Sequence, residues 1–552
     1  MSTNVSKEKR ELLVAKIKAI KSYIASALQD ENTAQLLAYI ADIEKDIKGK
    51  KYGLVFEEHR EKIDEILEQN TPVLTEEKDL FIDNGGQMNF LIEGDNLAAL
   101  QLLEKTHKGK INLIIIDPPY NTGNNDFIYD DTFVDNADLF AHSKYSAFMC
   151  KRLEIAYKLL HENGYIFVNI DENELYSLKL LCDDVFSEQN FVAMYMWEKT
   201  STPPALSKKV RKKLEYILCY AKNLDSRHQF SQGKIDGGDA PLLNGGNPIK
   251  TLVFPVGSIR FNIADGMYRQ GNDCKIDLLN DVIVANGCNQ NEVVARANFK
   301  WGQETLDKEV KNGTFFLVKS KNFSIRYQRV GVEKAKTPQN LLNADLGIGT
   351  NEEAKKELAE LGIPTFSYPK PISLYGFLTR MINLHKNIAI LDFFAGSGTT
   401  GHAVMKLNAE DGGRRRFILC TNNENNICRD VTYERIKRVI ERDKYEASLK
   451  YFKVDFVPIS DRLYYEYADE LLKHIRELVE LENGINFNGN AEIAIVLTEK
   501  ELDEFAANMP DKCKAIYLGH DVLPSEAQES LFKARGIAVN IIPDYYYREL
   551  EG

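Results

Sequence analysis

The residues best suited to chemistry are Asp117, Pro118, Pro119 and Tyr120, which directly follow the apolar run Ile114-Ile115-Ile116. Because two prolines cannot continue a central strand, they predict a stiff turn at the strand's end. The Asp117 carboxylate and the Pro118 carbonyl can each accept an N–H bond from an exocyclic amino group, which localises the lone pair of that poor nucleophile. Tyr120 offers a flat face for stacking an extruded base, worth about 1–3 kcal/mol. The alternative interpretation is a stiff surface turn.

A second group of chemically useful residues lies far downstream, around a glycine loop. Asp392 ends an apolar strand, and Gly396 and Gly398 allow a tight turn and close approach to a ligand. Thr399 and Thr400 then begin a helix whose free amides favour a polar or anionic group. Neither the third glycine of a dinucleotide loop nor the lysine of a triphosphate loop follows. Asp392 suits a cationic group such as the ammonium of a methionine moiety, although an ordinary strand-to-helix turn is the alternative.

Further short stretches accompany these two motifs. They are Gly94-Asp95-Asn96, Asn121-Thr122-Gly123, Phe167-Val168-Asn169-Ile170-Asp171-Glu172 and Tyr368-Pro369-Lys370-Pro371. With Phe394-Ala395-Gly396-Ser397-Gly398 last, the set resembles the DNA methyltransferases that methylate amino groups with S-adenosylmethionine. The order of the motifs resembles that of their beta class, because the catalytic motif comes first, an insertion follows and the glycine loop comes last. The closest likeness is to the modification subunit of type III restriction–modification systems, over roughly residues 80–450.

The resemblance implies transfer of a methyl group from S-adenosylmethionine to the N6 amino group of a flipped adenine in double-stranded DNA. It makes Asp117, Pro118, Pro119 and Tyr120 catalytic. Cofactor binding would fall to Asp95, Asn96, Lys370, Pro371, Asp392, Phe394, Gly396, Gly398, Thr399 and Glu424. Glu424 is assigned to the ribose hydroxyls, although Thr421-Asn422-Asn423 separates it from its strand, unlike the family's usual acidic residue.

DNA contacts are expected from Asn121 and from the start of the insertion. Trp197 is a candidate for base stacking, and Lys208, Lys209 and Arg211 for contacts with the phosphate backbone. Within the insertion, four arginines could read guanine, although a role in solubility is the commoner one for each: Arg260, Arg296, Arg326 and Arg329.

The elements that must position these residues alternate between strand and helix from about residue 80. This rhythm predicts an α/β fold, with a doubly wound, Rossmann-like parallel sheet in which distant strand ends can meet. The rhythm is lost in a Gly- and Asn-rich insertion with short β-like runs. We therefore expect a helical N-terminal arm (1–75), a catalytic half (76–197), a mostly β target-recognition domain (198–345), a cofactor half (346–455) and a small C-terminal α/β domain (456–552).

Composition describes an ordinary soluble protein. The 552 residues are 44% hydrophobic and 28% charged, enough for two to four domains. We expect a cytoplasmic protein, because the sequence has neither a signal-like N-terminus nor an apolar run of about 20 residues. Eight scattered cysteines without a Cys-x-x-Cys pair predict neither a metal site nor disulfides. The net charge of −12 does not exclude a local DNA groove, because basic runs occur at 208–213 and 414–416, although such runs are usually solvated faces.

The resemblance also implies partners and leaves alternatives open. It implies a homodimer, and a separate restriction subunit for any helicase or nuclease activity, because the sequence has no triphosphate loop. Cytosine N4 is an alternative target on the same fold, although aspartate before the prolines favours adenine in the resembled family. A DNA-binding specificity subunit without catalysis is another alternative, against which the intact Asp117 and Tyr120 argue. A protein or RNA methyltransferase fits the long basic insertion less well.

Overall fold

The computed structural model describes most of the chain. The described residues are 5–26, 31–48, 56, 59–122, 128–129, 132–133, 140–203, 208–225, 228–235, 239–272, 275–329, 334–363, 366, 368–459, 471–487, 490–519 and 521–542.

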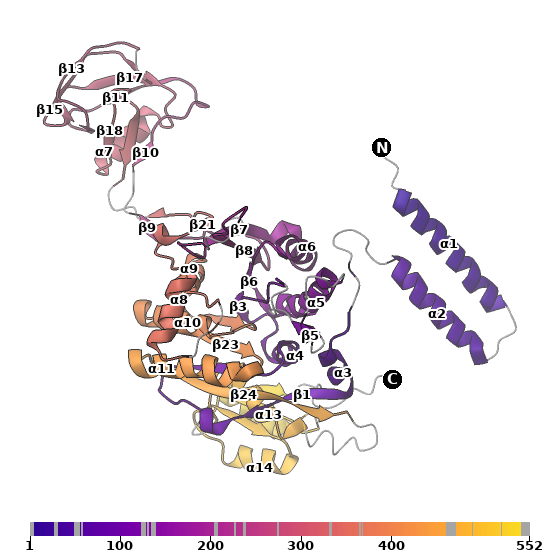
Figure 1. The fold of residues 1–552 in the computed structure, drawn as a ribbon. Helices are drawn as coiled ribbons and strands as arrows, with labels where there is room; N and C mark the ends of the chain where they lie inside the picture. Colours follow the sequence, from indigo (N-terminus) through magenta and orange to yellow (C-terminus); the bar gives the residue numbers. More distant parts are fainter. Residues whose placement is uncertain are drawn as a thin grey trace.

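A ten-stranded sheet forms the body of the molecule (Figure 1), and its central pairs are parallel, which confirms the predicted α/β fold class. Its outer pairs β1–β24, β6–β8 and β7–β8 are antiparallel. In spatial order the strands are β1 (Asn70–Glu76), β24 (Ala447–Pro458), β2 (Gln87–Glu93), β23 (Arg416–Thr421), β22 (Ala389–Asp392), β3 (Ile111–Ile116), β6 (Leu160–Ile170), β8 (Leu214–Ala221), β7 (Phe191–Glu198) and β21 (Leu341–Leu342).

Helices cover both faces of this sheet, so its central strands are buried on both sides. On β3, Ile114 and Ile116 enter one core, whereas Leu113 and Ile115 enter the other. This is why the last four residues of β3, 113–116, are all apolar rather than alternating. The first core contains residues of α4 (Asn96–His107), α5 (Ala141–Leu159), α6 (Leu175–Phe186) and α13 (Ile475–Asn483), and the second those of α8 (Asn351–Glu360), α9 (Ile372–Met381), α10 (Thr399–Asp411) and α11 (Glu434–Asp443).

The insertion folds as a mostly β unit with its own core and stands away from the body in Figure 1. At its base, β9 (Lys234–Ile235) pairs with β20 (Lys334–Ala335). Around α7 (Gln303–Lys311), it has one sheet of β10 (Ala240–Pro241), β19 (Ile325–Gln328), β18 (Phe315–Val318), β12 (Ile259–Phe261), β16 (Cys288–Asn289), β15 (Val282–Ala285) and β13 (Gly266–Tyr268), and a second of β11 (Lys250–Phe254), β17 (Val293–Ala297) and β14 (Asp277–Leu278).

Several of the expected domain boundaries differ from the structure. β21 was expected within the insertion but pairs with β7 in the large sheet, and α13, expected in the C-terminal domain, packs in the first core. β8 was expected within the insertion at 198–345, but it pairs with β6 and β7 in the large sheet. The reason is that most of β8 is buried, so its apolar side chains belong to the main cores. β1 was expected to belong largely to the N-terminal arm, yet it pairs with β24. The folded part of the insertion therefore begins after β8.

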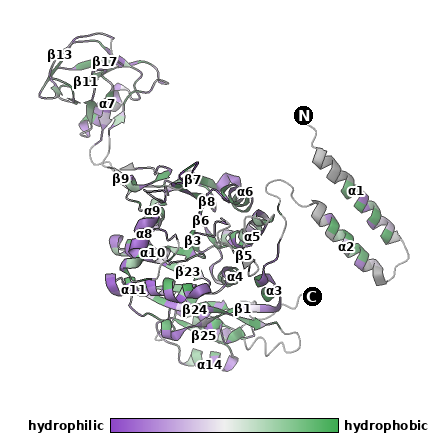
Figure 2. Ribbon diagram, in the orientation of Figure 1, coloured by the Kyte–Doolittle hydropathy of each residue, from purple (hydrophilic) through white to green (hydrophobic). Residues whose placement is uncertain are grey.

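The two ends of the chain form smaller units. At the N-terminus, α1 (Val5–Ser26) and α2 (Glu31–Lys48) form a hairpin apart from the body, and Figure 2 shows apolar residues along both helices. α3 (Lys62–Gln69) then leads into β1. The C-terminal unit is a parallel sheet of β25 (Ile493–Val496), β26 (Ala515–Leu518) and β27 (Ala538–Ile541), with α14 (Glu499–Ala507) and α15 (Glu526–Arg535). No described helix is long and apolar enough to span a bilayer.

Candidate active site

The two motifs meet at one edge of the large sheet. β22 and β3 are neighbouring parallel strands, with Ile390 opposite Leu113 and Leu391 opposite Ile114. Asp392 and Asp117 therefore lie at adjacent strand ends, where ligands bind in open α/β sheets. The turn Asp117–Tyr120, which was expected to be catalytic and is named the catalytic turn for that reason, thus lies beside the glycine loop, as expected.

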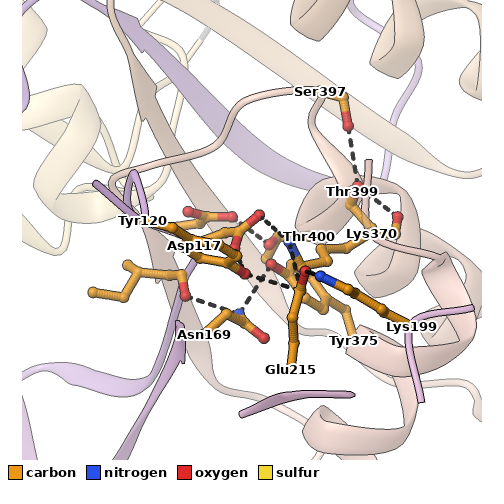
Figure 3. Close-up of polar contacts among 12 residues, drawn as sticks. Asp117, Tyr120, Asn169, Lys199, Glu215, Lys370, Tyr375, Ser397, Thr399 and Thr400 are labelled. Atoms are coloured by element: carbon orange, nitrogen blue, oxygen red, sulfur yellow. Dashed lines mark hydrogen bonds and ion pairs between the residues drawn. The ribbon is translucent and has the colours of Figure 1, made fainter. Parts of the chain in front are cut away.

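A buried network of hydrogen bonds and ion pairs surrounds Asp117 (Figure 3). The Tyr120 hydroxyl donates to Asp117 Oδ1 at 2.8 Å, and Lys370 Nζ donates to Asp117 Oδ2 at 2.7 Å. Lys370 Nζ also lies 5.1 Å from the centre of the Tyr120 ring. Lys370, expected to bind the cofactor, thus has its ammonium directed to the catalytic turn.

Glu215 of β8 adds a second carboxylate that the sequence analysis missed. Its Oε2 accepts from the Tyr120 hydroxyl at 3.1 Å and lies 3.5 Å from Lys370 Nζ, while its Oε1 accepts from Lys199 Nζ at 3.0 Å. The side chains of Glu215 and Lys370 are 3% and 4% exposed. One signal was available: Glu215 is the charged residue in an otherwise apolar strand, and buried charges are normally paired.

The environment of these groups changes their pKa values. Burial raises the pKa of Asp117, against the opposing effect of Lys370, and burial and Asp117 raise the pKa of Tyr120 well above its ordinary value. Burial alone would raise the pKa of Glu215, but Lys370 and Lys199 outweigh it and lower that pKa. Burial would lower the pKa of Lys370, but Asp117 and Glu215 outweigh it and raise that pKa. The site therefore holds a charged Glu215 and a charged Lys370 beside the carboxyl group of Asp117.

Asn169 and Tyr375 form hydrogen bonds next to the catalytic turn, at the end of β3. Asn169, at the end of β6, donates to the backbone oxygen of Ile116 at 2.8 Å and lies 3.3 Å from the Tyr375 hydroxyl. Its side-chain oxygen is buried and has no hydrogen-bond partner among the described residues. Buried side-chain oxygens normally accept a hydrogen bond. The Asn169 oxygen is therefore available to accept one from a ligand beside the catalytic turn. Asn169 lies within a stretch that carried the family resemblance, but it was not assigned a role.

The glycine loop is organised by Asp392. Its Oδ1 accepts from the Phe394 backbone N–H at 3.0 Å, and its Oδ2 accepts from the Thr400 hydroxyl. Burial raises the pKa of Asp392 to about 7. Gly396 and Gly398 have φ angles of 50° and 75°, which side chains disfavour. Asp392 was expected to pair with a cation, but its two oxygens accept from Phe394 in the loop and from Thr400 in α10.

Further contacts tie the glycine loop to the catalytic turn. The Thr399 hydroxyl donates to the backbone oxygen of Lys370 at 3.1 Å and accepts from the fully buried Arg435 at 2.9 Å. Arg435 also donates to the backbone oxygen of Ser397 at 3.2 Å. Pro371 immediately precedes α9 as its N-cap residue. Arg435 was not predicted, because nothing in its own stretch distinguishes it from the other basic residues of α11.

Asp95, Asn96 and Glu424 complete the expected cofactor residues. Asp95 begins α4 and accepts from Leu97 N at 2.7 Å, whereas Asn96 donates to the backbone oxygen of Phe393 at 3.0 Å. The Phe394 ring lies 5.9 Å from that of Phe148. Glu424 is exposed in a short 3-10 helix just after β23, the strand next to β22. Asn96 thus connects α4 to the glycine loop, and Glu424 lies at the same sheet edge.

The expected DNA contacts need two corrections. Trp197 is fully buried, and its ring N–H donates to the backbone oxygen of Gly349 at 3.0 Å, so stacking on a base is excluded in this structure. Asn121 is buried with φ 54° and donates to Glu174 at 2.6 Å, so it stabilises the turn rather than facing DNA. Trp197 was misassigned because its position in β7 directs it into the core. Gly123 lies outside the described residues.

The predicted basic residues remain at the surface. Lys208 and Lys209 are exposed, and Arg211 is exposed and donates to the backbone oxygen of Pro203 at 2.8 Å. Of the four arginines in the insertion, Arg296 pairs with Asp277, Arg326 with Asp239 and Arg329 with Glu309, whereas Arg260 lies 3.8 Å from the Phe315 ring centre.

Comparison with known proteins relates the chain to DNA methylases. Residues 111–433 match the family model N6_N4_Mtase, described as DNA methylase. The chain is 32% identical over 394 residues to the StyLTI Mod subunit of a type III restriction-modification enzyme from Salmonella typhimurium, covering 66% of this chain and 57% of that protein. It is 30% identical over 398 residues to the EcoPI Mod subunit of Escherichia phage P1, covering 62% and 58%. It is 29% identical over 360 residues to the type II methyltransferase M.KpnI of Klebsiella pneumoniae, covering 60% and 79%. The matches thus span less than three fifths of the two Mod subunits.

Proposed function

The chain belongs to the N6/N4 DNA methylase family, and we propose that it methylates the N6 amino group of an adenine extruded from duplex DNA, using S-adenosylmethionine. We further propose that it is the modification subunit of a type III restriction–modification system, since two of its relatives carry that name.

One observation carries the proposal: the catalytic turn and the glycine loop lie at adjacent strand ends, with Lys370 in contact with both. Such an arrangement supports the proposal, because a base held at the turn would lie beside a cofactor held at the loop. Neither motif alone requires this, because stiff turns and glycine loops occur separately in many folds.

The residues around the glycine loop fit the cofactor. At Gly398, an added Cβ would lie a tight 3.3 Å from Thr432 Cγ2, and both Gly396 and Gly398 have positive φ, so glycine is favoured at both positions of the loop. We assign the methionine part to Phe394, Gly396, Gly398 and Thr399 with Pro371, and the adenosine part to Asp95 and Glu424. When bound there, S-adenosylmethionine supplies an electrophilic methyl group.

The residues of the turn prepare the base. Asp117 and the Pro118 carbonyl accept the two N–H bonds of the amino group, which concentrates its lone pair on nitrogen. The Asp117 carboxylate also stabilises the positive charge that develops on that nitrogen. Tyr120 stacks on the ring, and the two prolines hold these acceptors in a fixed geometry, which avoids reorganisation during the reaction. Asn169 keeps the strand end in place through Ile116.

DNA would reach this edge between the body and the insertion. We propose that the insertion reads the target sequence and that Lys208, Lys209 and Arg211 contact phosphates, because they are exposed cations in the connection between β7 and β8. A homodimer and a separate helicase–nuclease subunit are the partners that the resemblance implies for a type III modification subunit.

Modified-base sequencing of DNA from cells that express the chain tests the proposal. We expect N6-methyladenine in one short sequence context and its loss with Asp117→Ala, while that variant still binds S-adenosylmethionine. N4-methylcytosine would overturn the adenine assignment. A purified chain that neither binds the cofactor nor labels DNA would overturn catalysis and leave a DNA-binding subunit.

A further inference from the structure

Lys370 and the Tyr120 hydroxyl both lie between two carboxylates rather than beside one. The hydroxyl is 2.8 Å from Asp117 Oδ1 and 3.1 Å from Glu215 Oε2. The ammonium is 2.7 Å from Asp117 Oδ2 and 3.5 Å from Glu215 Oε2. Lys199 holds the other oxygen of Glu215 at 3.0 Å. Glu215 therefore has a fixed position from which it can receive Lys370.

This arrangement conflicts with the role proposed for Asp117. An ammonium on Asp117 neutralises the carboxylate that should stabilise the cationic amine of the methylated base. Removing Lys370 from Asp117 without a new partner would leave a buried, unpaired charge, which is strongly destabilising. A shift of roughly 1 Å towards Glu215 would instead give Lys370 a normal charged hydrogen bond of about 2.7–2.9 Å.

The charges of the cluster balance before and after such a shift. When Asp117 is ionised, Asp117 and Glu215 supply two negative charges, and Lys370 and Lys199 supply two positive ones. Moving Lys370 therefore transfers it from Asp117 to Glu215, which keeps Lys199, without changing the net charge of the site. The amino group of the base can then occupy the position on Asp117 that the ammonium leaves.

We infer that Glu215 is a positioning residue that receives Lys370 when the target amino group displaces it from Asp117. This inference rests on the proposed function, because it assigns the displacing group to the flipped base. It gives the site a way to remain neutral when empty and to release Asp117 once a base carrying an amino group enters.

The test compares two duplexes that differ at the target base, once modified-base sequencing has identified the site. One carries adenine and the other carries purine, which lacks the amino group that would displace Lys370. We expect the wild type to bind the adenine duplex about tenfold more tightly, in line with one hydrogen bond to a charged group. In Glu215→Gln, this ratio should fall below about two, and kcat for methylation should fall at least about tenfold.

A control variant separates this role from structural damage. Glu480→Gln breaks another fully buried Glu–Lys pair, with Lys450, on the distant β24 side of the sheet. It should lower the melting temperature but leave the adenine-to-purine ratio unchanged. Glu215→Asp should restore part of the ratio. If Glu215→Gln does not fold, Lys199→Met, which frees Glu215 from its anchor, should reduce the same ratio.

The outcomes distinguish the two proposals. A wild-type chain that does not label DNA would overturn the proposed function itself. A wild type that methylates adenine, together with a Glu215→Gln variant that keeps its ratio or weakens binding of both duplexes equally, would overturn the role of Glu215 alone.

Discussion

Lys370 and Asp117 are 253 positions apart in the sequence, yet Lys370 Nζ lies 2.7 Å from Asp117 Oδ2. The backbone oxygen of the same lysine accepts from Thr399 of the glycine loop at 3.1 Å. One residue thus sets both the charge of the catalytic turn and the position of the loop that faces it.

Replacing Lys370 with methionine should shift the acidic limb of the pH–rate profile to higher pH. Lys370 lowers the pKa of Asp117 against the effect of burial, so its loss raises that pKa further. If the ionised form of Asp117 is active, the variant needs a higher pH to reach it, and its rate at pH 7 should fall at least about a hundredfold. Lys386→Met, an exposed control that bonds the backbone of Asp411, should leave the profile unchanged.

Gly398→Ala should weaken S-adenosylmethionine binding. Both Gly398 and Gly412 have positive φ, 75° and 67°, at the two ends of α10. An added Cβ at Gly398 would crowd Thr432, whereas nothing lies within 4 Å at Gly412. Both variants should lose about 1 kcal/mol of stability to backbone strain. Isothermal calorimetry should show reduced cofactor affinity only for Gly398→Ala, and equal affinities would contradict the assignment of the loop.

Asp392→Asn should stabilise the protein more at pH 8 than at pH 5. The pKa of Asp392 is about 7 in the folded chain, against an ordinary 3.8. The folded state therefore holds its proton more tightly, so stability falls as pH rises from about 4 to about 7. Asparagine does not titrate, so the variant does not lose this stability as the pH rises. The difference in melting temperature, variant minus wild type, should increase across that range, and a constant difference would contradict the raised pKa.

Trp197→Phe should affect folding rather than DNA binding. The change leaves the Gly349 carbonyl without its donor and opens space in a fully packed core, at a cost of about 1–3 kcal/mol. Thermal denaturation should show the loss, with DNA affinity measured below the melting temperature unchanged.

The double variant Lys208→Gln, Lys209→Gln should weaken DNA binding without affecting folding. Both side chains are exposed, so stability should remain within about 0.5 kcal/mol of the wild type. If both contact phosphates, the slope of log affinity against log salt should become shallower by about 2. Fluorescence anisotropy over a salt series measures this slope, and an unchanged slope would remove these lysines from the interface.

The sequence predicted the parts of the site that lie in contiguous motifs. Asp117–Tyr120 and Asp392–Gly398 could be identified because each follows an apolar strand, and parallel strands bring their carboxyl ends to one edge. Lys199 and Arg435 could not, because they come from stretches without a motif and reach the site only through strand order and helix packing. Glu215 also lacks a motif, and its one signal was a charged residue in an otherwise apolar strand. Trp197 was misassigned for the related reason that a strand's pairing decides which face its aromatic residue occupies.

The strand order also determines when this sheet can be completed. β22 and β23 lie between β2 and β3, although they follow both by roughly 300 residues, beyond the whole insertion. During synthesis, β2 and β3 therefore emerge long before the strands that separate them, and each presents an unpaired apolar edge. Such edges invite aggregation or wrong pairing. Contacts between residues this far apart also slow folding. A nascent chain that stops before residue 389 should thus depend on chaperones, and methylation competence should appear only near the end of translation.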